Sequence, residues 1–212
     1  MIRLQLDDRP RESDLVRSRS GDAITVRFAR PRDAEAVQAY VRSLSPRTRG
    51  NRFLGAISEL PQAVLDEFTH PGVDHRFSVV ATTLVEGFEI IIGEARYALD
   101  TDAAGFEFGL SLQDRWQGRG IGAALLNNLE CRAAALGAIS MFADTLRSNE
   151  AMIALARKSG YAFVRHPDDW RLLRFEKRVA YAPAQIPCTS WRPSAQARQA
   201  TVQAGAGEAR IA

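Results

Sequence analysis

The sequence predicts an α+β fold, in which a mixed, mostly antiparallel sheet of about seven strands carries helices on both faces. Strand-like and helix-like runs follow one another in the order strand, two helices, three strands, helix, strand, helix, two strands. Turn residues separate the three consecutive strands, which indicates an antiparallel meander. A crossover through a helix follows the meander, and it makes the sheet mixed.

The boundaries of these elements follow from local signals. The first helix begins at Pro31, because the missing N–H of a proline does no harm at a helix start. One later helix ends at Gly137, and another starts at Ser148-Asn149 and stops at Gly160. The expected strands are 23–29, 77–85, 89–99, 105–112, 138–144, 161–165 and 170–177. The expected helices are 31–41, 60–69, 148–160 and one that runs from the glycine-rich loop near 120 to 136.

Composition divides the chain into one domain and two tails. Residues 1–22 mix acidic and basic side chains with few apolar ones, which predicts a disordered N-terminal segment. Residues 182–212 are rich in Ala, Pro, Gln, Ser and Thr without periodicity, which predicts a flexible C-terminal tail. Trp191 is the tail residue expected to dock back on the domain. The domain itself is therefore expected at 23–181.

Composition and charge also exclude several classes of function. The 212 residues are 46% hydrophobic and 25% charged, as in soluble globular proteins, and no apolar run is long enough to span a membrane. The N-terminus lacks the apolar core of a signal peptide, so we expect a cytoplasmic protein without a membrane partner. The net charge is only +3. The sequence has no basic stripe with interleaved aromatic residues, so nucleic-acid binding is not expected. The one basic cluster is expected to be a solvated loop, and it comprises Arg42, Arg47, Arg49 and Arg52.

The cysteines and histidines carry no recognisable site pattern. Cys131 and Cys188 share no metal or redox spacing, so we expect buried or idle thiols in a reducing compartment. His70, His75 and His166 lack the spacing of metal ligands, so no metal is expected.

The stretch DRWQGRGIGAALLNNLE (114–130) places glycines where a helix begins. Glycine is unfavourable there unless the backbone needs a positive φ or a ligand approaches it closely. A P-loop is excluded, because the chain has no GK[ST] sequence. Gly118, Gly120 and Ala123 fit a dinucleotide-binding fingerprint with Asp144 as the ribose-binding acid, but three antiparallel strands precede the loop instead of alternating βαβ units.

A third interpretation fits the loop better. Gln117, Gly120 and Gly122 form Q-x-x-G-x-G after a strand and a turn, and free N–H groups at a helix N-terminus attract phosphates. On this QGRGIG stretch, and on the helix NEAMIALARKSGY (149–161), the chain resembles the GNAT superfamily of acyl-CoA N-acyltransferases. The opening VRFARPRDAEAVQAYVRSLSPRTRGNRFLG is similar to the GNAT domains of bacterial Pat-type protein lysine acetyltransferases. The resemblance spans about residues 23–177.

The resemblance implies a GNAT fold and an N-acetyltransferase that uses acetyl-CoA as its co-substrate. Strand 105–112 would splay from the next strand to admit the pantetheine arm, and backbone groups near Leu110 and Leu112 would pair with its amides. The resemblance also implies a set of residues that bind acetyl-CoA at the loop and the following helix, namely Gln117, Gly118, Arg119, Gly120, Ile121, Gly122 and Asn149.

The acceptor is expected to be a primary amine, on a protein lysine or a small molecule, that attacks the thioester directly in a ternary complex. The arginine cluster 42–52 would favour acceptors with nearby carboxylates over polyamines. The alternative is a non-catalytic acyl-CoA-binding domain that acts as a sensor or scaffold.

Acetylation of a lysine needs a base. At pH 7 only about four amines in ten thousand are unprotonated, a handicap of about 4.6 kcal/mol. Glu107 lies in an apolar strand and is expected on one face with Gly109 and Ser111, where burial would make it a stronger base. Pat-type relatives carry their glutamate base at this position. A structural ion pair with an arginine such as Arg96 is the alternative role for Glu107, and Glu94 is the second candidate for the base.

One departure from the family concerns the leaving thiolate. Many relatives place a tyrosine in the helix after Asn149 to protonate this sulfur, where this chain has Ala156. The role does not pass to Tyr161, which begins the next strand. A thiol with a pKa near 8.5 can leave as an anion, so the missing acid slows the reaction without abolishing it.

Overall fold

The structure is a computed structural model that describes residues 13–70, 76–100 and 105–208. Its strands form one eight-stranded sheet in the order β1-β2-β3-β4-β5-β6-β8-β7. Neighbouring strands are antiparallel, apart from the parallel pair β5 and β6. The predicted α+β class and the mixed, mostly antiparallel sheet are therefore confirmed. The eighth strand is β1, which forms where no fixed structure was expected.

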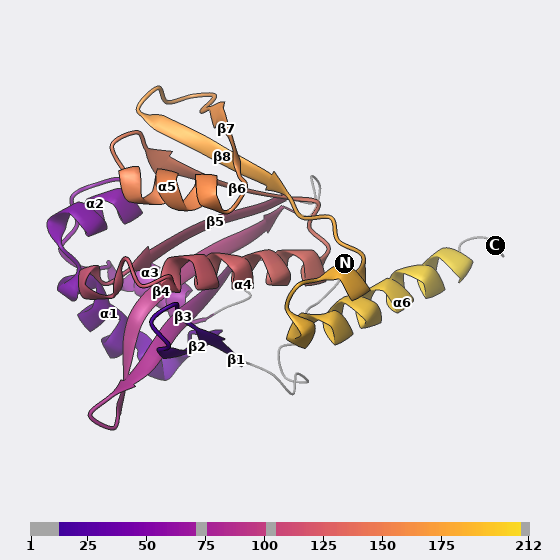
Figure 1. Cartoon of the computed structure of the whole chain (residues 1–212), viewed down its shortest axis with the longest axis horizontal. Helices are drawn as coiled ribbons and strands as arrows, with labels where there is room; N and C mark the ends of the chain where they lie inside the picture. The colour runs from indigo at the N-terminus through magenta and orange to yellow at the C-terminus, as the bar shows by residue number, and fades with distance from the viewer. Residues whose placement is uncertain (1–12, 71–75, 101–104, 209–212) are drawn as a thin grey trace.

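Helices are interspersed among these strands along the chain (Figure 1). The strands are β1 Ser13–Arg17, β2 Ala23–Phe28, β3 Arg76–Val85, β4 Phe88–Asp100, β5 Gly105–Leu112, β6 Ser140–Leu146, β7 Ala162–Arg165 and β8 Leu172–Arg178. The α-helices are α1 Ala34–Ser43, α2 Pro46–Phe53, α3 Gln62–Thr69, α4 Ile121–Leu136, α5 Glu150–Lys158 and α6 Arg192–Glu208. Short 3-10 turns occur at Pro31–Asp33, Asp114–Trp116, Pro183–Gln185 and Thr189–Trp191.

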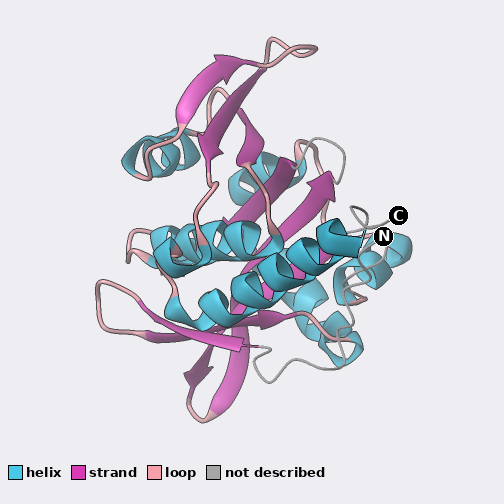
Figure 2. Cartoon of the chain, turned by 90° about the vertical axis from the view of Figure 1, so that its right-hand side faces the viewer, coloured by secondary structure: helices cyan, strands magenta, loops and turns pink. Residues whose placement is uncertain are grey.

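Two hydrophobic cores lie on opposite faces of the sheet, and Figure 2 shows helices on both of its sides. Successive side chains of a strand point to opposite faces. Val79 of β3 accordingly packs in the core beneath α4, whereas its neighbour Val80 packs against α1 and α3. Ile92 and Ile91 of β4 divide between the two cores in the same way.

Helix α2 forms where a solvated loop was expected around the arginine cluster. The Ser45 side chain accepts a hydrogen bond from the Thr48 N–H, and Pro46 occupies the first turn. The Asp114 carboxylate accepts from the hydroxyls of Ser45 and Thr48, each at 2.7 Å, and ties α2 to the loop before α4. Burial acts to raise the pKa of Asp114, but these bonds outweigh it and hold the pKa below its ordinary value.

Strand β1 and the segment before α6 are joined to α4 through one carboxylate, that of Asp14. Asp14 of β1 accepts hydrogen bonds from Asn128 at 2.7 Å and Arg132 at 3.2 Å on α4, and from Ser190 at 2.8 Å and the Trp191 indole at 2.9 Å. Trp191 is 6% exposed, so its expected docking on the domain is confirmed. A single half-buried carboxylate with four donors fixes both segments to the helix.

Two expectations about the tails are therefore wrong for part of their residues. Ser13–Arg17 forms β1, although 1–22 was expected to be disordered, and Arg192–Glu208 forms α6 within the expected flexible tail 182–212. A polar composition predicts disorder because the segment has little apolar surface to bury. Composition does not show that Asp14 bonds to residues far away in the sequence. Residues 1–12 and 209–212 of the two tails lie outside the described residues.

The expectation of idle thiols is also wrong. Cys131 on α4 and Cys188 before α6 form a disulfide between residues 57 positions apart. Their spacing matches no motif, and the pairing follows from packing, since Ile186, Trp191 and Ala195 bury their side chains against α4 beside the two cysteines.

Reduction of this disulfide is expected to lower the melting temperature. A bridge over a loop of this length stabilises a protein by about 2–4 kcal/mol, which corresponds to about 4–16 °C for a chain of this size. Calorimetry with and without a phosphine reductant measures the shift, and the Cys131→Ser/Cys188→Ser double variant, which should melt at the lower temperature in both buffers, is the control. Two titratable thiols in the unreduced folded protein, with no shift on reduction, would contradict the pairing.

No helix in the described ranges combines the length and apolarity that a crossing of the bilayer requires.

Candidate active site

Strands β5 and β6 separate halfway along their length. Their parallel pairing ends at Glu107 opposite Phe142, although β5 continues to Leu112 and β6 to Leu146. The splay expected for strand 105–112 is therefore confirmed. A cavity of about 390 Å³ lies in the opening, lined by residues of α2, β3 to β6, α5 and β8.

The backbone of β5 faces this opening at alternate residues. The carbonyl of Leu112 accepts a hydrogen bond from the Gln117 side chain at 3.0 Å, so it points away from β4. Because backbone groups alternate in direction along a strand, the N–H and C=O of Leu110 face the same way. Leu110 lines the cavity, whereas the Leu112 carbonyl is already used within the chain. Leu110 thus remains the better candidate to bind an extended amide ligand.

The glycine loop presents free N–H groups at the start of α4. Gly118 and Gly120 have φ values of 75° and 82°, which only glycine adopts without strain. Within the part of the chain that the structure describes, the N–H groups of residues 118–123 donate to no acceptor. The helix dipole adds partial positive charge at the same point. The loop therefore has the geometry of an anion site for phosphates.

Side chains around the loop hold it in place. A Cβ on Gly122 would lie 3.4 Å from Leu155 and 3.5 Å from Leu112, so the helix start packs closely on β5 and α5. The Arg119 guanidinium lies over the Trp116 ring, 4.8 Å from its centroid, and Trp116 packs beside the loop.

Asn149 caps α5 at the other side of the opening. Its side-chain oxygen accepts from the Met152 N–H at 3.3 Å, and its amide donates to the Thr145 hydroxyl at 3.0 Å. Asn149 also lines the cavity. Its predicted position beside the ligand is consistent with this place, while its polar atoms already serve the helix cap.

Glu107 lies on the cavity wall, but it is exposed. The burial expected to strengthen it as a base is therefore absent, although Glu107 is the last residue of β5 that pairs with β6. No ion pair between Glu107 and Arg96 occurs in the described ranges; Arg96 donates to Glu67 at 2.9 Å instead. The ion pair with Arg96 is thus not observed, although the charge of Glu107, after the hydrogen bonds to Asp144, is one of the causes that raise the pKa of Arg174.

Glu94 occupies a closed position. It is 0% exposed and accepts two hydrogen bonds from Arg52, at 2.5 and 3.0 Å, and one from the Ser111 hydroxyl at 2.6 Å. Burial opposes the charge on Arg52, but the pairing with Glu94 outweighs it and raises the pKa of Arg52. Tyr40 extends the network through Ser111 at 2.9 Å, and burial raises its pKa well above the ordinary value. Glu94 therefore anchors α2 to the sheet.

Most of the basic cluster is occupied by neighbouring groups. Arg42 pairs with Glu59 at 2.6 Å, and Arg49 donates to backbone carbonyls at the end of α1. Arg52 reaches the cavity, where it lies over Gly109: a Cβ there would come within 3.0 Å of its Nη1. The expectation of a solvated basic loop is therefore wrong. Of the four arginines in the cluster, only Arg47 is exposed and without a partner among the described residues.

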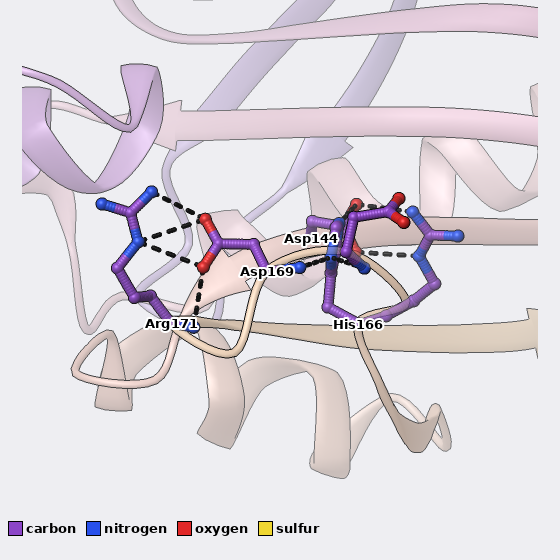
Figure 3. A network of polar contacts seen from close by, with 6 residues as sticks. Asp144, His166, Asp169 and Arg171 are labelled. Atoms are coloured by element: carbon purple, nitrogen blue, oxygen red, sulfur yellow. Dashed lines mark hydrogen bonds and ion pairs between the residues drawn. The ribbon is translucent and has the colours of Figure 1, made fainter.

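A second polar network lies on the β6 and β8 side of the cavity (Figure 3). Asp144 of β6 lines the cavity and accepts from Arg174 at 2.8 and 2.9 Å. His166 Nε2 lies 3.3 Å from the same carboxylate, while its Nδ1 accepts from the N–H groups of Asp168 and Asp169. Asp144 is thus committed to structural contacts, and the dinucleotide alternative loses its ribose-binding acid.

Neither residue at the expected thiolate-protonating region supplies an acid to the cavity. Ala156 is fully buried, and Tyr161 is 5% exposed with its hydroxyl directed at the Met141 sulfur. Burial, then the nearby Glu130, raise the pKa of Tyr161 far above its ordinary value. No cluster of three or more metal-ligating side chains occurs in the described ranges, and His75 lies outside them.

Comparisons with known proteins agree with one another. The family model described as "Acetyltransferase (GNAT) family" matches residues 51–161. The chain is 31% identical over 149 residues to Acetyltransferase PA5475 of Pseudomonas aeruginosa, an alignment that covers 70% of this chain and 80% of that protein. The crystal structure of the GNAT domain of S. lividans PAT matches with a TM-score of 0.72 at 24% identity, over 80% of this chain and 98% of that domain. Spermidine N-acetyltransferase from Vibrio cholerae, in complex with CoA and spermine, matches with a TM-score of 0.60 at 14% identity, over 74% and 96% of the two chains.

Proposed function

Because the chain belongs to the acetyltransferase (GNAT) family, we propose that it moves the acetyl group of acetyl-CoA to a primary amine by direct attack in a ternary complex. The observation that carries this proposal is the set of free N–H groups at 118–123, which lies beside the opening between β5 and β6. An anion site next to a slot along an unpaired strand edge fits a ligand with a diphosphate and an extended amide arm.

The residues that would hold acetyl-CoA divide by the part of the ligand they contact. Backbone groups of Gly118 to Gly122 would bind the diphosphate, and those of Leu110 would pair with the pantetheine amides. Gln117 would keep the turn closed through its bond to the Leu112 carbonyl. Asn149 would border the arm from the cap of α5.

Glu107 would act as the base, directly or through water. The amine nitrogen forms a bond to the thioester carbon, the carbon–sulfur bond breaks, and the amine proton passes to the Glu107 carboxylate. Main-chain donors on the splayed edge of β5 would polarise the carbonyl. CoA leaves as a thiolate, which needs no acid because a thiol has a pKa near 8.5. Glu94 is a poor alternative base, since it is buried and held by three hydrogen bonds.

The acceptor would carry a carboxylate near its amine. Three arginines line one wall of the cavity: Arg52, Arg76 and Arg96. Arg76 and Arg96 share Glu67 as their partner, at 3.8 and 2.9 Å, and no acceptor is recorded in the described chain for Arg52 Nη1. The strand register places Arg76 and Arg96 on the same face of the sheet as Glu107, so positive charge lies beside this carboxylate. A protein lysine with an acidic neighbour, or an amino-acid-like amine, matches this arrangement.

A thiol-release assay with two acceptors tests this assignment. We expect a peptide with aspartate beside its lysine to be acetylated faster than spermidine, with a difference that shrinks in high salt because exposed charges are screened. Arg76→Ala should raise KM for the peptide severalfold and leave kcat nearly unchanged. Arg47→Ala, an exposed α2 arginine outside the cavity lining, is the matched control. A preference for spermidine that salt does not alter would contradict the acidic acceptor.

The alternative is a sensor or scaffold that binds acyl-CoA without turnover, and the apolar residue at Ala156 favours it. Binding of acetyl-CoA without thiol release for any amine would support this alternative. The cytoplasmic location stays a prediction, and the Cys131–Cys188 disulfide counts against it because cytosolic thiols are mostly kept reduced.

A further inference from the structure

We propose that Arg19, in the turn between β1 and β2, is a further ligand of the acyl-CoA diphosphate. This inference rests on the proposed function, since it assumes that the free N–H groups at the start of α4 receive the phosphates. Arg19 belongs to the part of the chain that precedes the loop by about 100 residues, and the family motif on QGRGIG does not include it.

Strand β1 is fixed against α4, so the position of the turn is fixed as well. Asp14 of β1 bonds to Asn128 and Arg132 of α4, and β1 pairs along its full length with β2. The turn itself is closed by Asp22, which accepts from the hydroxyls of Ser18 and Ser20 at 2.8 and 2.5 Å. These bonds hold the backbone that carries Arg19.

The turn touches the glycine loop at Arg19. The Arg19 N–H donates to the carbonyl of Arg119 at 3.1 Å. A Cβ on Gly120 would lie 2.9 Å from Arg19 Cγ and 3.2 Å from its backbone nitrogen. Glycine is therefore needed at position 120 for two reasons. Its φ is 82°, and a side chain would collide with Arg19. The Arg19 side chain starts at the residue that caps α4, on the edge of the anion site.

The charge of Arg19 is available for a ligand. The side chain is exposed, and no ion pair involves Arg19 in the ranges that the structure describes. Arg119, its neighbour across the loop, instead places its guanidinium over Trp116. A guanidinium can donate two parallel hydrogen bonds to a phosphate, in addition to its charge. Arg19 would thus add a cationic wall to a site otherwise made of backbone amides.

Calorimetric titration of CoA into the unmodified chain and two variants tests the proposal. Arg19→Ala should weaken CoA binding by about tenfold, the effect of losing a hydrogen bond to a charged group. Arg17→Ala removes the same charge from an exposed position two residues earlier, and it should bind CoA as the unmodified chain does. Both variants should melt at the unmodified temperature without ligand, because neither side chain forms an ion pair with another described residue.

Shortened ligands locate the contact. Dephospho-CoA keeps the diphosphate but lacks the 3′-phosphate, so the tenfold effect of Arg19→Ala should persist with it. Pantetheine lacks all phosphates, so the two chains should bind it equally. Equal CoA affinity of Arg19→Ala and the unmodified chain, or an effect that vanishes with dephospho-CoA, would overturn this inference while leaving the proposed function intact. Failure of the unmodified chain to bind CoA would overturn the proposed function and this inference together.

Discussion

Replacement of Glu107 by glutamine is expected to lower kcat by about 10²–10⁴ and to leave the Kd for acetyl-CoA unchanged. Glutamine keeps the size and polarity of the side chain but cannot accept the amine proton. Glu107 is exposed on the cavity wall without an ion pair to Arg96, so the substitution removes no observed structural contact of that kind. Thiol release measures the rate, and calorimetric titration measures acetyl-CoA binding.

The pH dependence separates a base from a structural residue. The rate of Glu107→Gln should rise about tenfold per pH unit up to the amine pKa near 10.4, because the free amine then needs no base. Glu176→Gln, which changes an exposed glutamate on β8 that does not line the cavity, should keep full activity. Full activity of Glu107→Gln at pH 7 would show that Glu107 is not the base.

Substitution of Gly122 by glutamate is expected to abolish the thermal stabilisation that acetyl-CoA confers. Ligand at 100 times its Kd adds about 2.7 kcal/mol, or several degrees for this chain. A carboxylate in the first turn of α4 would repel the diphosphate and fill the space over the free N–H groups. The Cβ itself meets Leu155 and Leu112 at ordinary contact distances of 3.4 and 3.5 Å, so the fold should tolerate the change.

Two further variants isolate the effect of position. Gly122→Ala adds only the tolerated Cβ and should retain the thermal shift. Asn127→Glu places the same charge on an exposed site of α4 one turn and a half later, and it should also retain the shift. An undiminished shift with Gly122→Glu would show that acetyl-CoA does not bind at this loop.

The parts of the fold that could be predicted from sequence are those coded by local pattern. The strand at 105–112 has the predicted bounds, since glycine and turn residues flank an apolar run. Gly137 ends α4 with a φ of 87°, as expected of a glycine stop. Helix α2 was not predicted, although the sequence contains a signal for it. Ser45-Pro46 is a typical helix start.

The remaining features depend on contacts between distant residues. Asp14 gains its four donors from α4 and from the C-terminal segment, and no window of sequence shows that these meet. The same holds for the Cys131–Cys188 bridge and for the pairing of Arg52 with Glu94. Alternation along one strand could place the face of Glu107 but not its burial, because burial depends on which distant segments cover that face.

Label transfer from acetyl-CoA tests directly whether the chain acetylates an amine. The chain is incubated with acetyl-CoA that carries ¹³C in its acetyl group and with a lysine peptide, and mass spectrometry locates the label. Direct transfer predicts labelled acetyl on the lysine side-chain nitrogen, formed with one free CoA per acetyl transferred, and none with Gly122→Glu. Stable binding of the labelled acetyl-CoA with no label on any amine acceptor would contradict catalysis.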